Sequence, residues 1–299
     1  MTDLLARFID DLDLRGLSKG TQATYRAVLV PYFRHLGKDP CTATKEDFKA
    51  WLYFIRKERG QKTKTVELSF SILSSFYEYL LDEGLVVANP IPVFRKRNLR
   101  AYKSNDGGTR RSISIEEAGR LVSSIVDSRD RAIIMLLLKT GVRRHELAEL
   151  DIEDVDMEDM SIQLKPTPKR SNRTVFFDGE AYDALVWWLQ ARKRLIRRDS
   201  ALFVGSSGYR LKPDSINRMI KEHAIRVELH DPKSKRHEDH FTAHSCRHFL
   251  TTHLLRAGMK REYVQWLRGD AIRDAVDIYF HINPEDVREQ YLAYVPKFG

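Results

Sequence analysis

Apolar residues recur at helical spacing along most of this chain. Leu5, Phe8, Ile9 and Leu12 recur every three or four positions, and similar spacing continues through three further segments up to residue 90. Residues at this spacing lie along one face of an α-helix, so each segment can bury one side against its neighbours. The first 90 residues are therefore predicted to form a small all-helical domain of four helices.

Capping residues mark the ends of several predicted helices. Thr44 and Asp47 have the spacing of a capping box and predict a helix that starts at residue 45. Gly84 is a good C-cap residue and predicts the end of the fourth helix. Farther along the chain, Ser114 and Glu117 predict another helix start by the same spacing as Thr44 and Asp47.

Residues 94–103 contain five basic residues and are followed by the segment SNDGGT, whose Gly, Asn and Asp content is typical of a linker. A basic linker is most often simply soluble, but between two domains of a cationic protein it is equally suited to lie along a nucleic-acid backbone. We therefore predict a helical domain over residues 1–93, a basic linker over 94–111 and a second domain over 112–299.

The second domain is predicted to be mainly helical, with a small β-hairpin or sheet. Residues 131–140, RAIIMLLLKT, form the most apolar helical segment and are expected at the centre of the core, with Gly141 as its end. The segments MSIQL and TVFF have the pattern of two short antiparallel strands, joined by the basic hairpin TPKRSNR. The acidic run 149–159 is expected to face solvent.

The formal net charge of +9 favours a polyanionic partner, because Lys and Arg that neutralise phosphates release counterions. Residues 1–105 hold 18 basic and 12 acidic residues, so the first third of the chain carries +6 of this charge. No apolar run approaches the roughly 18 residues that cross a bilayer, and the N-terminus carries acidic residues where a secretory signal would be basic. We therefore expect a cytoplasmic protein that does not associate with membranes.

Several cofactor classes have no support in the sequence. There is no Walker A loop, GxGxxG or HExxH pattern, and the acidic pairs lack the spacing of a metal site. Cys41 and Cys246 are far apart and have no CxxC partner, so both are expected to be small core residues. We predict no metal and no cofactor.

The segment from His244 to Ile282 contains the strongest candidates for chemistry. A helix that starts near Thr242 would have a polar face and an apolar face. The polar face carries His244, Arg247, His248 and Thr251, and the apolar face carries Cys246, Leu250, Leu254 and Ala257.

Arg143 follows the buried segment and its glycine turn, so a rigid scaffold would hold its guanidinium. Arg143 and Arg247 could together bind a phosphate bidentately. Each arginine alone is more commonly a salt-bridge or surface residue. Tyr279 lies on a stripe with Ile272 and Val276 and is equally compatible with a core position, and a phenol is a poor nucleophile unless positive charge stabilises the phenolate.

Four motifs, TGVRRHEL, TPKRSNR, HSCRH and DIYFH, occur in the order and at about the spacing found in the tyrosine recombinase (phage integrase and Xer-type) superfamily. The chain resembles this family over almost its full length, and its Xer-like features suggest an archaeal or mobile-element type. The N-terminal segment resembles the family's core-binding, SAM-like domain. The resemblance implies a two-domain architecture in which a helical domain and a mixed α/β catalytic domain clamp duplex DNA.

The resemblance also implies a mechanism. Tyr279 would attack the scissile phosphate to form a 3′-phosphotyrosyl link and release a 5′-hydroxyl. The hydroxyl of a partner strand would then reverse this step. Arg143 and Arg247 would stabilise the transition state, His244 would accept or donate a proton, and neither ATP nor metal would be needed. Lys169 on the hairpin is expected to be the general acid, with Lys165 as the alternative.

One position departs from the family pattern. Members usually carry His or Trp as a phosphate donor after the glycine that precedes the tyrosine segment, where this chain has Gly269 and Asp270. An ionised carboxylate cannot donate a hydrogen bond to phosphate. Either another residue, such as Arg268 or His281, makes the contact, or Asp270 orients one of the arginines.

The resemblance implies double-stranded DNA as the partner, a homotetramer assembled on two DNA sites, and accessory DNA-bending proteins. Two alternatives remain open: a catalytically silent DNA-binding protein of the same fold, and a type IB topoisomerase. The target site is not predicted, and neither is the choice between integration, excision and dimer resolution. The C-terminal tail, DVREQYLAYVPKFG, is suited to docking on a neighbouring protomer or packing within its own chain.

Overall fold

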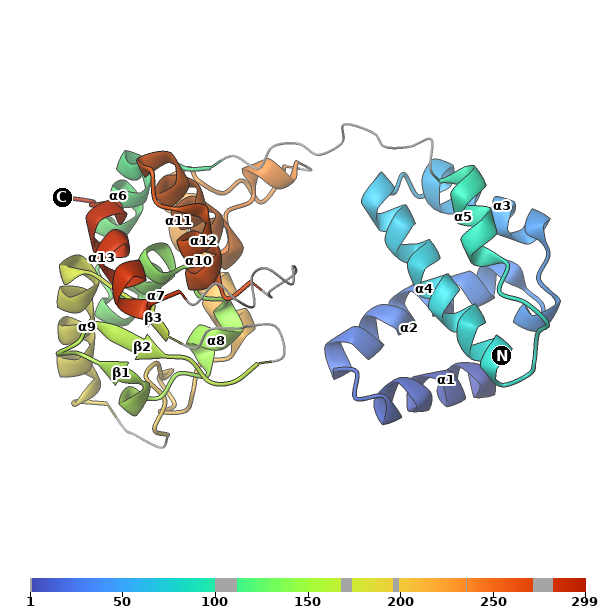
Figure 1. Cartoon of the computed structure of the whole chain (residues 1–299), viewed down its shortest axis with the longest axis horizontal. Coiled ribbons are helices and arrows are strands. Elements are labelled where there is room, and N and C mark those ends of the chain that lie inside the picture. The colour runs from blue at the N-terminus through green and yellow to red at the C-terminus, as the bar shows by residue number, and fades with distance from the viewer. Residues whose placement is uncertain (1, 100–111, 168–173, 196–198, 235, 271–281) are drawn as a thin grey trace. The chain divides into compact units, whose positions relative to one another are not determined.

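The computed structural model describes residues 2–99, 112–167, 174–195, 199–234, 236–270 and 282–299. The chain divides into two compact units, Met1–Gly108 and Thr109–Gly299 (Figure 1). Each unit has its own hydrophobic core, as the helical spacing of its apolar residues predicts.

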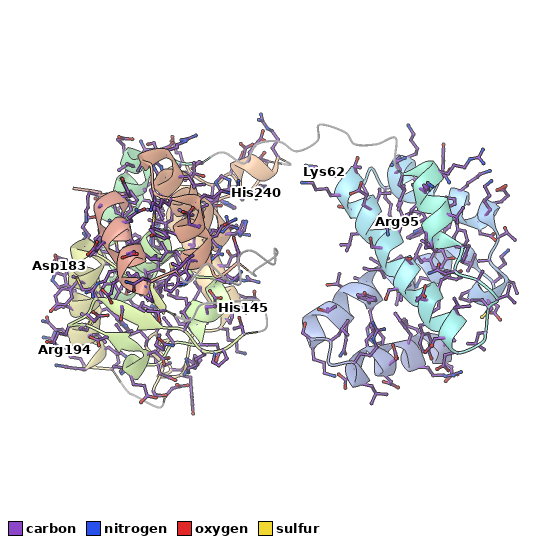
Figure 2. The ribbon with its side chains drawn as sticks, in the orientation of Figure 1. Lys62, Arg95, His145, Asp183, Arg194 and His240 are labelled. Carbon is purple, nitrogen blue, oxygen red and sulfur yellow. The ribbon has the colours of Figure 1, made fainter. Side chains whose placement is uncertain are left out.

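The described part of the N-terminal unit is entirely helical. Its elements are α1 (Thr2–Leu14), α2 (Lys19–Leu36), a 3₁₀ turn (Pro40–Thr42), α3 (Lys45–Tyr53) with a π-helical continuation (Phe54–Glu58), α4 (Thr63–Asp82) and α5 (Ile91–Asn98). The four predicted helices are confirmed as α1 to α4. Basic side chains, including Lys62 before α4 and Arg95 on α5, lie on the surface of this unit (Figure 2).

The capping box at Thr44 is confirmed. The backbone N–H of Thr44 donates to Asp47 Oδ2 at 2.6 Å, and α3 begins at the next residue. Lys38 Nζ lies 2.7 Å from the same carboxylate oxygen. This ion pair is the main reason that the pKa of Asp47 falls to about 2, with the Thr44 hydrogen bond adding to it.

The linker predicted over residues 94–111 starts too early, because α5 extends to Asn98. Phe94 is buried and stacks on Phe70 of α4, with ring centroids 5.2 Å apart, and Leu99 is also buried. Residues 94–98 therefore belong to the helical unit and not to a linker, because they complete α5 and Phe94 packs against α4. Residues 100–111 lie outside the described part of the chain.

The C-terminal unit is mixed, as predicted. Its helices are α6 (Ile115–Ser123), α7 (Ser128–Thr140), α8 (Arg144–Ala148), α9 (Gly179–Arg192), α10 (Pro213–Arg226), α11 (Ala243–Ala257), α12 (Arg261–Arg268) and α13 (Pro284–Tyr294). Its strands are β1 (Val155–Asp156), β2 (Ser161–Gln163) and β3 (Thr174–Phe176), and 3₁₀ turns occur at Ile152–Asp154 and His237–Asp239.

Helix α7 is the centre of this unit. All its residues from 132 to 140 are buried, and it contacts α6, α8, α9, α10 and α11. The capping box of Ser114 and Glu117 starts α6, and Gly141 ends α7 in the left-handed conformation at φ 62°. The predicted central helix and both of these helix ends are confirmed.

The sheet is antiparallel in the order β1-β2-β3 and contains one more strand than predicted. Ile162 pairs with Val175, and both side chains are buried. The extra strand β1 lies within the acidic run 149–159. Leu150 and Asp151 of this run are buried, so the prediction that the run faces solvent is wrong. Asp151 accepts hydrogen bonds from Lys165, Ser200 and Arg210, which offset the cost of burying its carboxylate.

The last residues of the chain pack against α7 and α9 of the same chain. Lys139 is completely buried and its Nζ lies 2.8 Å from Asp178 Oδ2, while the Phe298 ring lies 4.2 Å from that Nζ. The N–H groups of Phe298 and Gly299 donate to Glu180 Oε1 at 2.9 and 3.1 Å. Within this single chain the tail therefore takes the intramolecular arrangement that the sequence left open.

Candidate active site

The end of α7 places Arg143 at the start of a second helix. After the turn at Gly141, Arg143 is the N-cap residue of α8, and its backbone N–H donates to Glu146 Oε2 at 2.7 Å. The guanidinium of Arg143 donates to the other oxygen of that carboxylate at 2.8 Å. Because the Glu146 side chain is only 4% exposed, it is a fixed support for the more exposed arginine.

Two backbone carbonyls accept hydrogen bonds from Arg247. This arginine lies on α11, whose N-cap is Thr242, as the sequence predicts. Its NH1 donates to the carbonyl oxygen of Gly141 at 2.8 Å, and its NH2 donates to that of Arg268 at 2.7 Å. The side chain is 8% exposed, so α7, α11 and α12 together orient a nearly buried cation.

The opposite face of α11 is mostly apolar and buried, as predicted. Cys246, Leu250 and Leu254 belong to the core, but Ala257 is exposed in the last turn, where the apolar-face prediction is wrong. Burial raises the pKa of Cys246 to about 12, which agrees with a core thiol and not a nucleophile.

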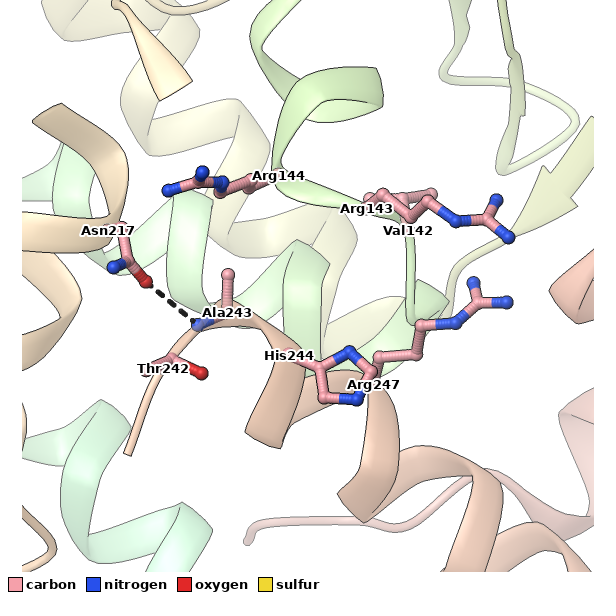
Figure 3. Close-up of a pocket in the computed structure, with 8 residues that line it drawn as sticks. All are labelled: Val142, Arg143, Arg144, Asn217, Thr242, Ala243, His244 and Arg247. Carbon is pink, nitrogen blue, oxygen red and sulfur yellow. Dashed lines mark hydrogen bonds between the residues drawn. The ribbon is translucent and has the colours of Figure 1, made fainter. Parts of the chain in front are cut away.

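Arg143, His244 and Arg247 line one pocket of about 290 Å³ (Figure 3). The guanidinium groups of Arg143 and Arg247 extend toward the same end of it (Figure 3). The remaining lining residues are Val142, Arg144, Asn217, Thr242 and Ala243. Arg143 precedes His244 and Arg247 by about 100 positions in the sequence, and the structure brings these three predicted site residues together.

Neither Arg144 nor Asn217 was predicted at this pocket. The Arg144 guanidinium lies 2.9 Å from the carboxylate of Asp214 at the start of α10, and Asn217 Oδ1 accepts from the N–H of Ala243 at 3.5 Å (Figure 3). The doublet Arg143-Arg144 was visible in the sequence. No local pattern, however, indicates that α10 packs beside the start of α11.

Asp270 lies between two arginines at the edge of this site. Its Oδ2 is 2.9 Å from Arg268 Nε, and its Oδ1 is 3.6 Å from Arg247 NH2. The sequence predicts either that Asp270 orients an arginine or that Arg268 supplies a contact, and this geometry agrees with both. His281, the other candidate for that contact, lies outside the described residues.

The two lysine candidates differ in what the structure describes. Lys165 follows β2 and forms an ion pair with Asp151, and its Nζ lies 3.8 Å from Asp154. Burial raises the pKa of Asp151, but the hydrogen bonds from Lys165, Arg210 and Ser200 outweigh it and hold that pKa well below its usual range. Lys165 thus has a structural role in this conformation. Lys169 and Tyr279 lie outside the described residues.

The described residues lack two further features. No group of three or more His, Cys, Asp and Glu side chains among them is arranged to hold a metal ion. None of the helices described above combines the length and the apolar character needed to cross a membrane.

Two family models match the chain. The model "Phage integrase family" covers residues 112–286, and "Phage integrase, N-terminal SAM-like domain" covers residues 4–85. The chain is 30% identical to Tyrosine recombinase XerC of Alcanivorax borkumensis over 283 residues, which span 93% of this chain and 88% of that protein. It is 28% identical to Tyrosine recombinase XerC of Actinobacillus succinogenes over 300 residues, which span 97% and 96%.

Solved structures of similar fold cover both units. The Tn1549 transposon integrase in complex with circular intermediate DNA is similar with a TM-score of 0.73 at 20% identity, over 96% of this chain and 97% of that chain. A lambda integrase dimer bound to a COC′ core site is similar with a TM-score of 0.68 at 17% identity, over 93% and 76%. The mainly helical fold with a small sheet is therefore shared with two-domain integrases.

Proposed function

The chain belongs to the phage integrase family as a site-specific tyrosine recombinase, and we propose that Arg143, His244 and Arg247 form the pocket in which it cleaves and rejoins DNA. The observation that carries this proposal is the pair of anchored guanidinium groups. Glu146 supports one and two backbone carbonyls support the other, so both are in place before a phosphate arrives.

The two arginines suit a phosphodiester for an electrostatic reason. Attack on phosphorus places charge on the non-bridging oxygens, and fixed guanidinium donors stabilise this charge without reorganising. The buried Arg247 is screened less by water than an exposed arginine, so its charge acts more strongly.

Tyr279 is the nucleophile that we propose, from the motif it shares with the family. Its phenolic oxygen forms a bond to phosphorus as the bond from phosphorus to the 5′-oxygen breaks. The phenol loses its proton to a base, and Lys169 donates a proton to the departing 5′-oxygen. In the return step a 5′-hydroxyl attacks the 3′-phosphotyrosine and releases the phenol, so the phosphodiester is restored without an energy source.

His244 is placed to handle protons in this reaction. Its ring is exposed at the pocket that Arg143 and Arg247 line, whereas Arg247 one helical turn away is buried. An imidazole exchanges protons near neutral pH, so we assign it the role of proton acceptor in one direction and donor in the other.

Duplex DNA is the partner of this reaction. We propose that the protein acts as a homotetramer that holds two DNA sites, with accessory DNA-bending proteins as further partners. Neither a silent DNA-binding protein nor a type IB topoisomerase is favoured by any observation on this chain.

Covalent capture tests the proposal on DNA of any sequence. The full-length protein is incubated with nicked duplexes of randomised sequence on both sides of the nick, and DNA that stays attached after denaturation is sequenced. We expect an enriched site that the wild-type protein and the surface control Tyr53→Phe both capture, and that Tyr279→Phe does not. Equal capture by Tyr279→Phe, or no capture by the wild-type protein, contradicts the proposal.

A further inference from the structure

We propose that Arg268 is a third cation that contacts the scissile phosphate, and that Asp270 is a positioning residue that holds Arg268 there. This inference rests on the proposed function and adds a residue to it. The juxtaposition behind it is one carboxylate between two guanidinium groups, with its short contact at 2.9 Å to Arg268 Nε and its longer one at 3.6 Å to Arg247 NH2.

Asp270 is not what orients Arg247. The NH1 and NH2 groups of Arg247 each donate to a backbone carbonyl, at 2.8 and 2.7 Å. The 3.6 Å separation from Asp270 is longer than a hydrogen bond, so the carboxylate adds only a charge interaction at that arginine. The closest contact of Asp270 is its ion pair with Arg268 Nε at 2.9 Å, so we infer that Arg268 is the side chain that it positions.

The backbone fixes Arg268 at the site. Arg268 is the last residue of α12, and its carbonyl oxygen is the one that receives Arg247 NH2. Gly269 then turns the chain at φ 59°, and the N–H groups of Gly269 and Asp270 donate back to Trp266 and Gln265. This helix end returns the Asp270 carboxylate to the side chain of Arg268 within two residues.

Charge explains why Arg268 needs such a partner. Two guanidinium groups close together repel each other, and the Arg268 side chain is 39% exposed, so without a carboxylate it would extend into solvent. The negative charge of Asp270 offsets this repulsion, and it lies closest to Nε of Arg268. The terminal nitrogens of a guanidinium are the ones that bind phosphate oxygens in a planar fork.

Arg268 and Asp270 would thus take the place of the His or Trp that family members usually carry as a phosphate donor at position 270. Asp270 cannot donate to phosphate when ionised, but Arg268 can, and its charge also favours the transition state more than a neutral donor would. Both residues contact Arg247, which lines the pocket: Arg268 through its carbonyl oxygen at 2.7 Å and Asp270 through Oδ1 at 3.6 Å.

The test uses the DNA site recovered by covalent capture, with a normal or a methylphosphonate linkage at the scissile position. A methylphosphonate replaces one charged oxygen by a neutral methyl group, so a residue that contacts that charge matters less on it. We expect Arg268→Ala to slow adduct formation on the order of 10- to 100-fold on the phosphate, and much less on one methylphosphonate diastereomer. Arg256→Ala removes an exposed arginine at the far end of α11 and should change neither rate.

A double-mutant cycle tests the positioning role of Asp270. Asp270→Ala, or Asp270→Asn if the alanine variant folds poorly, should slow the reaction in the wild-type background and have no further effect in Arg268→Ala. The inference fails if Arg268→Ala reacts as fast as the wild-type protein, or if its defect is equal on both linkages. It also fails if Asp270→Ala accelerates the reaction or has the same effect in both backgrounds. In each of these cases wild-type capture persists, so the proposed function stands independently.

Discussion

Arg247 NH1 donates to the carbonyl oxygen of Gly141 at 2.8 Å, which ties α11 to the end of α7 across 106 positions of sequence. Gly141 adopts the left-handed conformation that ends α7, and Arg143 follows two residues later. One glycine therefore ends the central helix, supports one arginine of the site and sets the position of the other.

Gly141→Ala is expected to impair both stability and cleavage. A Cβ at this position would lie 3.1 Å from Leu250 Cδ2 and 3.7 Å from Arg247 Cγ, and an alanine at positive φ costs about 1–2 kcal/mol. We expect urea unfolding to report at least this loss, and adduct formation to fall more than DNA binding does.

Gly84→Ala is the matched control. Gly84 has a similar φ of 68°, but an added Cβ meets nothing within 4 Å. The variant should lose a similar conformational free energy and keep the cleavage rate of the wild-type protein. If both alanine variants cleave equally well, Gly141 has no role in placing Arg247.

Arg247→Ala should remove cleavage far more than binding. Loss of one preorganised donor costs about 10²–10³-fold in rate, whereas duplex affinity is spread over many phosphate contacts. Adduct formation and equilibrium binding on the captured site measure the two quantities. An equal loss of both would assign Arg247 to DNA docking instead.

Lys169→Ala and Lys165→Ala are expected to differ in how their cleavage rates depend on the leaving group. If Lys169 protonates the 5′-oxygen, Lys169→Ala should cleave a normal linkage slowly and a 5′-bridging phosphorothiolate at nearly the wild-type rate, since a thiolate leaves without a proton. Lys165→Ala should instead lower stability through Asp151 and show no such rescue. Rescue of Lys165→Ala alone would exchange the two roles.

Lys139→Met should destabilise the C-terminal unit. Burial raises the pKa of Asp178, but the hydrogen bond and charge of Lys139, with help from Lys297, bring it below its usual value. Without Lys139, the Asp178 carboxylate, which is only 1% exposed, keeps only the weaker ion pair with Lys297. Loss of one partner of a buried ion pair typically lowers the free energy of unfolding by about 3–5 kcal/mol.

Lys49→Met is the control for the Lys139 variant. Lys49 pairs with Glu46 at 3.1 Å, but its side chain is 50% exposed, so its loss should change stability by less than about 0.5 kcal/mol. Thermal or urea unfolding of the full chain compares the two. Similar effects of both variants would show that the buried ion pair contributes little.

Asp47→Asn should make the free energy of unfolding depend less on pH in the acidic range. The pKa of Asp47 is about 2 in the folded chain, below the unfolded value of about 3.9. A lowered pKa means that its contribution is fully present above pH ~4 and is lost as the pH falls through about 2. Unfolding measured between these values should depend less on pH in the variant, and an unchanged slope would contradict this assignment.

Much of the secondary structure followed from local patterns. The spacing of Leu5, Phe8 and Leu12 predicted α1, and the capping boxes at Thr44 and Ser114 marked helix starts correctly. These signals are local because a cap and its helix lie within four residues of each other. Helix α5 was missed because its second half carries the basic run Arg95 to Arg97, which was interpreted as the start of a linker, whereas burial of Ile91 and Phe94 holds it in the helical unit.

By itself the sequence determined the family and most of the helices, and it predicted Arg143, His244 and Arg247 as site residues, because each depends on residue type and short-range spacing. Only the tertiary structure decided what holds those side chains: Glu146 for one arginine, and the carbonyls of Gly141 and Arg268 for the other. A backbone carbonyl has the same chemistry at every residue. Its use as a partner therefore depends on packing between distant helices and leaves no trace in the sequence.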